Sequence, residues 1–235
     1  MKNLDYKNHY KKDAELFDYF ENNKYDNDYN KRLHSFIINF VKNNNNNILD
    51  VGSGGGWTAW KLKHKGNLFL TDLSHKNLCL IKKEKNIESV VADAIALPYK
   101  ENSFDYIIIS EVLEHINEPN KVIGGGVIAL LKKCGKIIIT TPYNEKIKYN
   151  LCVHCNQITP TNAHLHSFNI ESMKNICSEF EFSSLEFYKF GNKLFTITRL
   201  SYLLRFLPFF IWRIIDKTLN LFIDKPNTLV VIITK

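Results

Sequence analysis

A glycine-rich segment near the start of the chain has the residue types of a nucleotide-binding turn. The stretch Asp50-Val51-Gly52-Ser53-Gly54-Gly55-Gly56 directly follows the apolar pair Ile48-Leu49 and precedes a helix-like stretch. Glycine lets the backbone turn sharply and approach a ligand without a Cβ atom in the way. The N-terminus of the following helix adds unpaired N–H groups and the positive end of its dipole. We therefore expect a ligand with a carboxylate or a phosphate group at this loop.

An acidic residue stands where a ribose would need one. Asp72 ends the next predicted strand, 68–71, and comes 20 residues after Gly52. A carboxylate at this place can accept hydrogen bonds from both hydroxyls of a ribose. The pattern Gly54-x-Gly56-x-x-Ala59 also satisfies the looser dinucleotide fingerprint. From these residues alone a nicotinamide dinucleotide, S-adenosylmethionine and a tight βα turn without a ligand all remain open.

Three later blocks decide between these readings. They read VADAIALP at 91–98, SFDY at 103–106 and SEVLEHI at 110–116. Together with the glycine loop, and in this order, they resemble the class I S-adenosylmethionine-dependent methyltransferases. The likeness is to the group that includes the ubiquinone and menaquinone biosynthesis methyltransferases, and it covers about residues 30–142.

The resemblance assigns roles to eight residues of the predicted cofactor site. It implies that Asp50 and the three glycines hold the methionine part, that an aspartate binds the ribose and that a second aspartate meets the adenine together with the next backbone group. A serine at the end of the fourth strand would line the cofactor's other side. In chain order these residues are Asp50, Gly52, Gly54, Gly56, Asp72, Asp93, Ala94 and Ser110.

Apolar strands alternate with helical stretches along most of the chain. Such alternation, with strands apolar on both faces, predicts an α/β fold with a parallel sheet between two helical layers. With the resemblance, it predicts a doubly wound, Rossmann-like methyltransferase sheet of seven strands whose last strand is antiparallel. We expect a helical cap at 1–45, the S-adenosylmethionine-binding core at 46–142 and an acceptor-side region at 143–235. The glycines Gly124, Gly125 and Gly126 fall inside a predicted helix at 118–132, which they would weaken.

The predicted chemistry is transfer of a methyl group to a small-molecule, lipid-like or glycan acceptor. The protein must align the acceptor atom with the methyl group and exclude water. An oxygen or carbon acceptor can also need a general base, and histidine is the commonest one. His115, close to the end of the fourth strand, and His166 are the candidates, with His164 as a further one. A nicotinamide-dependent oxidoreductase and a cofactor-binding protein without catalysis are the alternatives.

A cysteine- and histidine-rich excursion follows the core at 144–168. Cys152, Cys155, His164 and His166 have the residue types of a tetrahedral structural zinc site. Their spacing fits no standard zinc finger, so ordinary loop residues are an alternative. The segment from His164 to Phe168 also resembles one that borders the acceptor pocket in related methyltransferases. A role in acceptor binding is therefore open as well.

An aromatic and basic segment at 199–223 lies between the last two predicted strands. One reading is an interfacial helix that touches a membrane, or a lid over a lipid-like acceptor. The other is a helix buried against the sheet or a second subunit, with its arginines on the solvated rim.

Composition sets the remaining expectations. The chain has 31 Lys+Arg against 24 Asp+Glu, a net charge of +7, but its basic residues form no long block, which argues against a nucleic-acid partner. Five scattered cysteines are typical of a reducing compartment. The polar N-terminus does not read as a signal peptide, and no apolar run is long enough to span a bilayer. We expect a cytoplasmic protein, with peripheral membrane contact through 199–223 as a second option.

Overall fold

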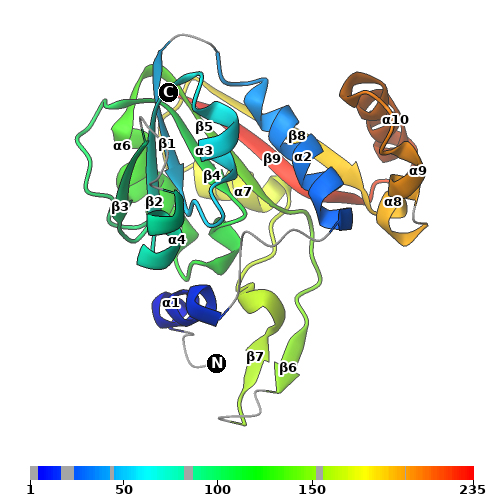
Figure 1. The fold of residues 1–235 in the computed structure, drawn as a ribbon, viewed down its shortest axis with the longest axis horizontal. Coiled ribbons are helices and arrows are strands. Elements are labelled where there is room, and N and C mark those ends of the chain that lie inside the picture. Colours follow the sequence, from blue (N-terminus) through cyan, green and yellow to red (C-terminus); the bar gives the residue numbers. More distant parts are fainter. Residues whose placement is uncertain (1–4, 17–23, 43–44, 82–86, 152–155, 199) are drawn as a thin grey trace.

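The structure is a computed structural model, which describes residues 5–16, 24–42, 45–81, 87–151, 156–198 and 200–235. One sheet of seven strands forms its centre, in the order β3-β2-β1-β4-β5-β9-β8 (Figure 1). The first five of these strands run parallel, and β9 is antiparallel to both of its neighbours. The predicted α/β sheet is therefore confirmed. Its strands are β1 (Asn46–Val51), β2 (Gly66–Asp72), β3 (Ile87–Val91), β4 (Phe104–Ser110), β5 (Leu131–Pro142), β8 (Ser184–Asn192) and β9 (Pro226–Thr234).

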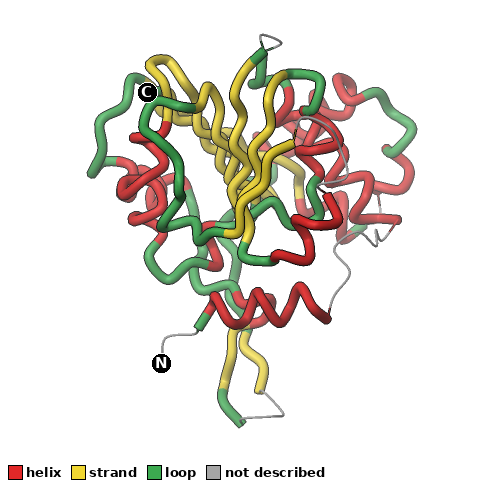
Figure 2. Tube along the Cα trace, turned by 60° about the vertical axis from the view of Figure 1, so that its left-hand side comes forward, coloured by secondary structure: helices red, strands yellow, loops and turns green. Residues whose placement is uncertain are grey.

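Helices cover both faces of this sheet, as the two views show (Figures 1 and 2). The alternation of side chains along a strand creates the two layers. In β4, Ile107 and Ile109 belong to one apolar cluster and Ile108 belongs to the other. The helices are α1 (Tyr6–Leu16), α2 (Lys24–Ile38), α3 (Trp57–Leu62), α4 (His75–Ile81), α5 (Pro119–Val122), α6 (Ile128–Leu130), α7 (Ile170–Cys177), α8 (Lys193–Ile197), α9 (Leu200–Leu204) and α10 (Phe209–Phe222).

The helix predicted at 118–132 is interrupted by a π-helical turn. This turn, Ile123–Val127, separates α5 from α6, and β5 already begins at Leu131. The ring of Phe180 accounts for one of the three glycines, because a Cβ atom on Gly124 would lie 1.7 Å from Phe180 Cε1. Gly124 therefore admits an aromatic ring against the helix backbone.

Residues 144–168 form a projection beyond the carboxyl ends of the parallel strands. A hairpin of β6 (Tyr149–Leu151) and β7 (Ile158–Pro160) extends away from the body of the molecule (Figure 2). A short 3₁₀ turn, Thr161–Ala163, then leads the chain back toward the sheet. The projection thus brings residues after β7 next to the ends of the central strands.

The described part of the aromatic segment folds into α9 and α10, which follow α8 beside the β8 edge of the sheet (Figure 1). The reading of a buried helix placed the arginines of this segment on the solvated rim. Arg213 is buried instead, where it pairs with Asp216 and lies over the rings of Phe36 and Phe190. The apolar side chains on the other face of this segment are exposed. They are Leu203, Phe206, Phe210, Ile211, Ile214, Leu221 and Phe222.

Candidate functional site

A large cleft opens at the carboxyl ends of the parallel strands, between the β1–α3 loop and the end of β4. Because β1 and β4 are neighbours in the sheet while their connections run in opposite directions, this is the switch point where open α/β sheets bind ligands. The volume of the cleft is about 1120 Å³. Helix α1 and residues 160–164 contribute its outer walls.

The glycine loop forms one wall, and its backbone requires glycine. Gly52, Gly54 and Gly56 have φ angles of +74°, +47° and +70°, which L side chains rarely adopt. A Cβ atom on Gly52 would also lie 2.4 Å from Val112 Cγ2. At Gly54, by contrast, a Cβ atom would meet no protein atom within 4 Å, and this residue lines the cleft. The loop therefore presents bare backbone to a ligand.

Asp72 lines the cleft beside this loop and holds it in place. Its Oδ2 accepts a hydrogen bond from the Gly54 N–H at 2.8 Å, and its Oδ1 accepts one from the Ser74 N–H at 2.7 Å. A carboxylate has about four acceptor positions, so two remain for hydroxyl groups in the cleft. Burial raises the pKa of Asp72, and the nearby backbone N–H groups of Ser74, Gly54 and Leu73 oppose this rise.

Asp50 lies beneath the loop rather than in the cleft. Its side chain is 1% exposed, and its Oδ2 accepts a hydrogen bond from the Thr58 hydroxyl at the start of α3. Burial raises the pKa of this carboxyl group to about 7. Asp50 and Gly56 are the two residues of the predicted cofactor set that do not line the cleft.

Asp93 and Ala94 lie on the cleft wall after β3, where α1 crosses the opening. The Tyr6 hydroxyl donates to Asp93 Oδ2 at 2.9 Å, and Lys7 Nζ lies 2.6 Å from the same oxygen. Asp93 also accepts from the Ile95 N–H at 3.2 Å. A helical cap at 1–45 was expected, but the contacts of Tyr6 and Lys7 with Asp93 were not, because these residues are 87 and 86 positions away from Asp93 in the sequence.

The opposite wall follows β4 and carries titratable side chains. Ser110 Oγ lies 3.0 Å from Thr140 Oγ1, and Glu111 next to it has a φ angle of +54°. Strained backbone of this kind is typical of functional sites. Desolvation by the surrounding wall and the nearby Glu145 carboxylate raise the pKa of Glu111, and the Thr140 hydroxyl opposes this rise, although part of Glu111 is exposed. Burial and Glu111 also raise the pKa of Glu114 well above its usual value.

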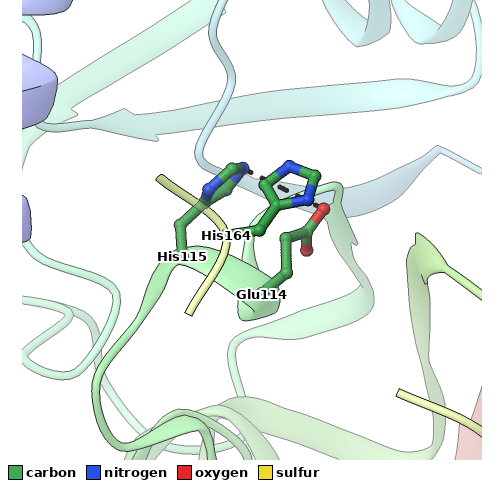
Figure 3. Close-up of side chains that lie close together, drawn as sticks. All are labelled: Glu114, His115 and His164. Atoms are coloured by element: carbon green, nitrogen blue, oxygen red, sulfur yellow. Dashed lines mark ion pairs between the residues drawn. The ribbon is translucent and has the colours of Figure 1, made fainter. Parts of the chain in front are cut away.

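His115 lines the cleft on this wall, close to His164 (Figure 3). Its Nδ1 is hydrogen-bonded to the Tyr10 hydroxyl and lies 3.4 Å from the Ala163 carbonyl oxygen. Burial and the neighbouring His164 lower the pKa of His115 to about 4. The imidazole is therefore neutral at pH 7, the form that can accept a proton or a metal ion.

The remaining predicted residues lie elsewhere or outside the described chain. His164 lines the cleft, and its Nδ1 is 2.5 Å from Glu145 Oε2. His166 does not line it, since its Nε2 lies 3.3 Å from the Asn117 carbonyl and its ring packs against Phe168. Cys152 and Cys155 fall outside the described residues, so the predicted zinc site remains a prediction.

Some residues of this wall were not given a role from the sequence. Glu111 and Glu114 stand in the same SEVLEHI block as His115, and their spacing could have indicated them. Tyr10 and Glu145 carry no comparable signal, because only the fold brings α1 and the projection to this wall.

Comparisons with known proteins agree with this geometry. The family model described as a methyltransferase domain matches residues 49–139. The ubiquinone/menaquinone biosynthesis C-methyltransferase of Rickettsia prowazekii is 30% identical over 60% of this chain and 66% of its own length. The Rickettsia akari protein of the same name is 30% identical over 62% of this chain and 68% of its own length. An S-adenosylmethionine-dependent methyltransferase from Mesorhizobium loti has the same fold, with a TM-score of 0.59, 15% identity, and coverage of 87% of this chain and 98% of its own.

The chain therefore belongs to the class I S-adenosylmethionine-dependent methyltransferases. It spans about two thirds of the length of the curated relatives it matches. Among the described residues, no helix is both long and apolar enough to cross a membrane.

Proposed function

We propose that this chain transfers the methyl group of S-adenosylmethionine to a small, lipid-like acceptor. One observation carries the proposal: a single cleft has a glycine loop and ribose-type carboxylate on one wall and Glu111 and His115 on the opposite wall. Its volume of about 1120 Å³ exceeds the roughly 300–1,000 Å³ usual for one ligand. An acceptor therefore has room beside the cofactor.

In this proposal the cofactor lies along the glycine loop. Gly52 and Gly54 offer bare backbone to the methionine part, and Asp72 keeps acceptor positions for the ribose hydroxyls. Asp93 and the backbone of Ala94 meet the adenine, with Tyr6 and Lys7 holding the carboxylate. Asp50 acts through Thr58 and the loop above it. The bound cofactor supplies an activated methyl group, so this chain must mainly align the acceptor and exclude water.

His115 is the proposed base for an acceptor that must lose a proton. Its ring is neutral, lines the cleft and is oriented by Tyr10 and Ala163. Helix α1 supplies Tyr10 and also lines the cleft through Tyr6, His9, Asp13 and Ala14.

Two observations support a lipid-like acceptor. The curated relatives are named for ubiquinone and menaquinone biosynthesis, whose products are lipid-like quinones. In addition, α9 and α10 expose large apolar side chains such as Phe210 and Phe222, which suit peripheral contact with a membrane surface. The described residues of 200–223 do not line the cleft, so we assign them to this contact rather than to a lid.

The test supplies methyl-labelled S-adenosylmethionine and a demethylated quinone precursor in detergent micelles. We expect label in the organic phase, bound to the quinone, and its loss in the Asp72→Ala variant. Fractionated cell extract provides the comparison. Label that accumulates in protein or RNA, with none in lipid, would contradict the acceptor class.

A further inference from the structure

Three side chains on the acceptor wall converge on one point that the cofactor does not explain. Glu114, His115 and His164 each offer one ligand atom, and these atoms all lie within 4.8 Å of one another (Figure 3). His115 Nε2 is 3.9 Å from Glu114 Oε1. The backbone fixes the two contributing segments together, because the Leu165 N–H donates to the Glu114 carbonyl at 2.7 Å.

The Glu114 carboxylate is buried and, among the described residues, has no lysine or arginine partner. Its side chain is 1% exposed, and the hydrogen-bonding groups that lower its raised pKa are the Thr141 hydroxyl and the Glu114 backbone N–H. A buried carboxylate without a counter-ion is costly. Glu111 and Glu145 add negative charge nearby, and within the described ranges no lysine or arginine forms an ion pair with any of the three. The site therefore lacks a positive charge.

Both imidazole rings are held from outside the cluster. His164 Nδ1 lies 2.5 Å from Glu145 Oε2, and His115 Nδ1 is hydrogen-bonded to Tyr10 and faces the Ala163 carbonyl. Histidines that bind metals are typically oriented in this way by a carboxylate or a carbonyl group. The rings thus have the supporting contacts that a metal site needs.

We propose that Glu114, His115 and His164 bind a divalent first-row transition-metal ion of the zinc type. Two imidazoles and one carboxylate suit such an ion, whereas Mg²⁺ and Ca²⁺ prefer oxygen ligands alone. Three protein ligands leave a further position open. His115 and His164 line the cleft and Glu114 lies behind them, so the open position faces the cleft. An oxygen atom of the methyl acceptor would bind there in its deprotonated form, and His115 would then be a metal ligand instead of the base; this role rests on the proposed function.

The test uses Co²⁺ as a visible-absorption probe of the full chain stripped of metal. We expect one equivalent to bind, with a spectrum free of sulfur-to-cobalt charge transfer. Removing an outer partner of a metal ligand typically weakens binding by about 10–100-fold. We therefore expect Glu114→Gln and His164→Gln each to weaken it by at least about 100-fold. His166→Gln is the matched control, since this nearby histidine is outside the cluster, and its affinity should stay within about twofold of the wild type.

Each alternative outcome overturns the proposal. If the wild type is folded, as circular dichroism would show, but does not bind Co²⁺ saturably, the proposal is wrong. This result does not depend on whether a variant folds. Equal loss in His166→Gln or Cys152→Ser, with a thiolate charge-transfer band, would assign the metal to the cysteine-containing set. S-adenosylmethionine affinity is measured separately on the metal-free protein. Normal cofactor binding and methyl transfer without any metal would refute this inference and leave the proposed function standing.

Discussion

Replacing Asp72 tests the cofactor wall directly. Two of its acceptor positions are used by the Gly54 and Ser74 N–H groups, and two remain for the ribose hydroxyls. A hydrogen bond to a charged group contributes about 1.5–3 kcal/mol. Losing two of them in Asp72→Ala should cost about 3–6 kcal/mol of binding free energy. At about 1.4 kcal/mol for each factor of ten, the Kd should rise by roughly 10²–10⁴-fold.

The assay is isothermal titration calorimetry with S-adenosylmethionine, accompanied by thermal melting. Asp72→Asn should fall between the wild type and Asp72→Ala, because its carbonyl oxygen can still accept from the Gly54 N–H. The control is Asp105→Asn, which loses a 2.8 Å ion pair with Lys132 outside the cleft. It should leave the Kd within about twofold of the wild-type value. A folded Asp72→Ala protein whose Kd rises less than about threefold would refute the ribose assignment.

Four further substitutions test the glycine loop and the packing elsewhere in the fold. Gly54→Ala should cost about 1–2 kcal/mol of stability, because Gly54 has a left-handed φ angle, and it should weaken cofactor binding at least tenfold. A Cβ atom added at Gly126 would also meet no neighbouring atom, but Gly126 lies in a helical turn. Gly126→Ala should therefore stabilise the protein by about 0.5–1 kcal/mol. A Gly54 variant that binds the cofactor normally would contradict the bare-backbone argument. Burial raises the Asp50 pKa from 3.8 to about 7 in the folded state. The free energy of unfolding of the wild type should therefore fall as the pH rises through this window. In urea unfolding between pH 5 and pH 8, this fall should be smaller for Asp50→Asn than for the wild type by on the order of 3 kcal/mol. Parallel pH profiles would disprove this. Asp216→Ala should lower the free energy of unfolding by about 3–5 kcal/mol, since it leaves the buried Arg213 unpaired, and a loss below 1 kcal/mol would mean that the arginine finds water.

Local sequence was sufficient where one segment builds its own part of the site. The glycine loop and Asp72 could be placed from the sequence, because a strand, a turn and a helix N-terminus define where a βα loop lies. The seven-stranded sheet could also be predicted, since strands that are apolar on both faces need helical layers on both sides. The contact of Gly124 with Phe180 could not, because the ring comes from 56 positions further along the chain.

The tertiary structure decided which side chains meet. The family resemblance implies that Asp50 holds the methionine part of the cofactor, but the fold buries it beneath the loop against Thr58. His164 and His166 are two positions apart, yet only His164 lines the cleft. His166 instead lies against the Asn117 carbonyl, where the chain returns from β7 toward the sheet.

The sequence by itself thus determined the fold class and the glycine loop at which we propose that the methyl donor binds, since both depend on short segments whose geometry is local. Only the tertiary structure brought Tyr10 from the first helix, Glu114 and His115 from the end of β4, and His164 from the projection to one wall. Such a meeting depends on long-range packing of the sheet and its insertions, which no spacing along the chain encodes. The acceptor side of the cleft is therefore a property of the folded molecule.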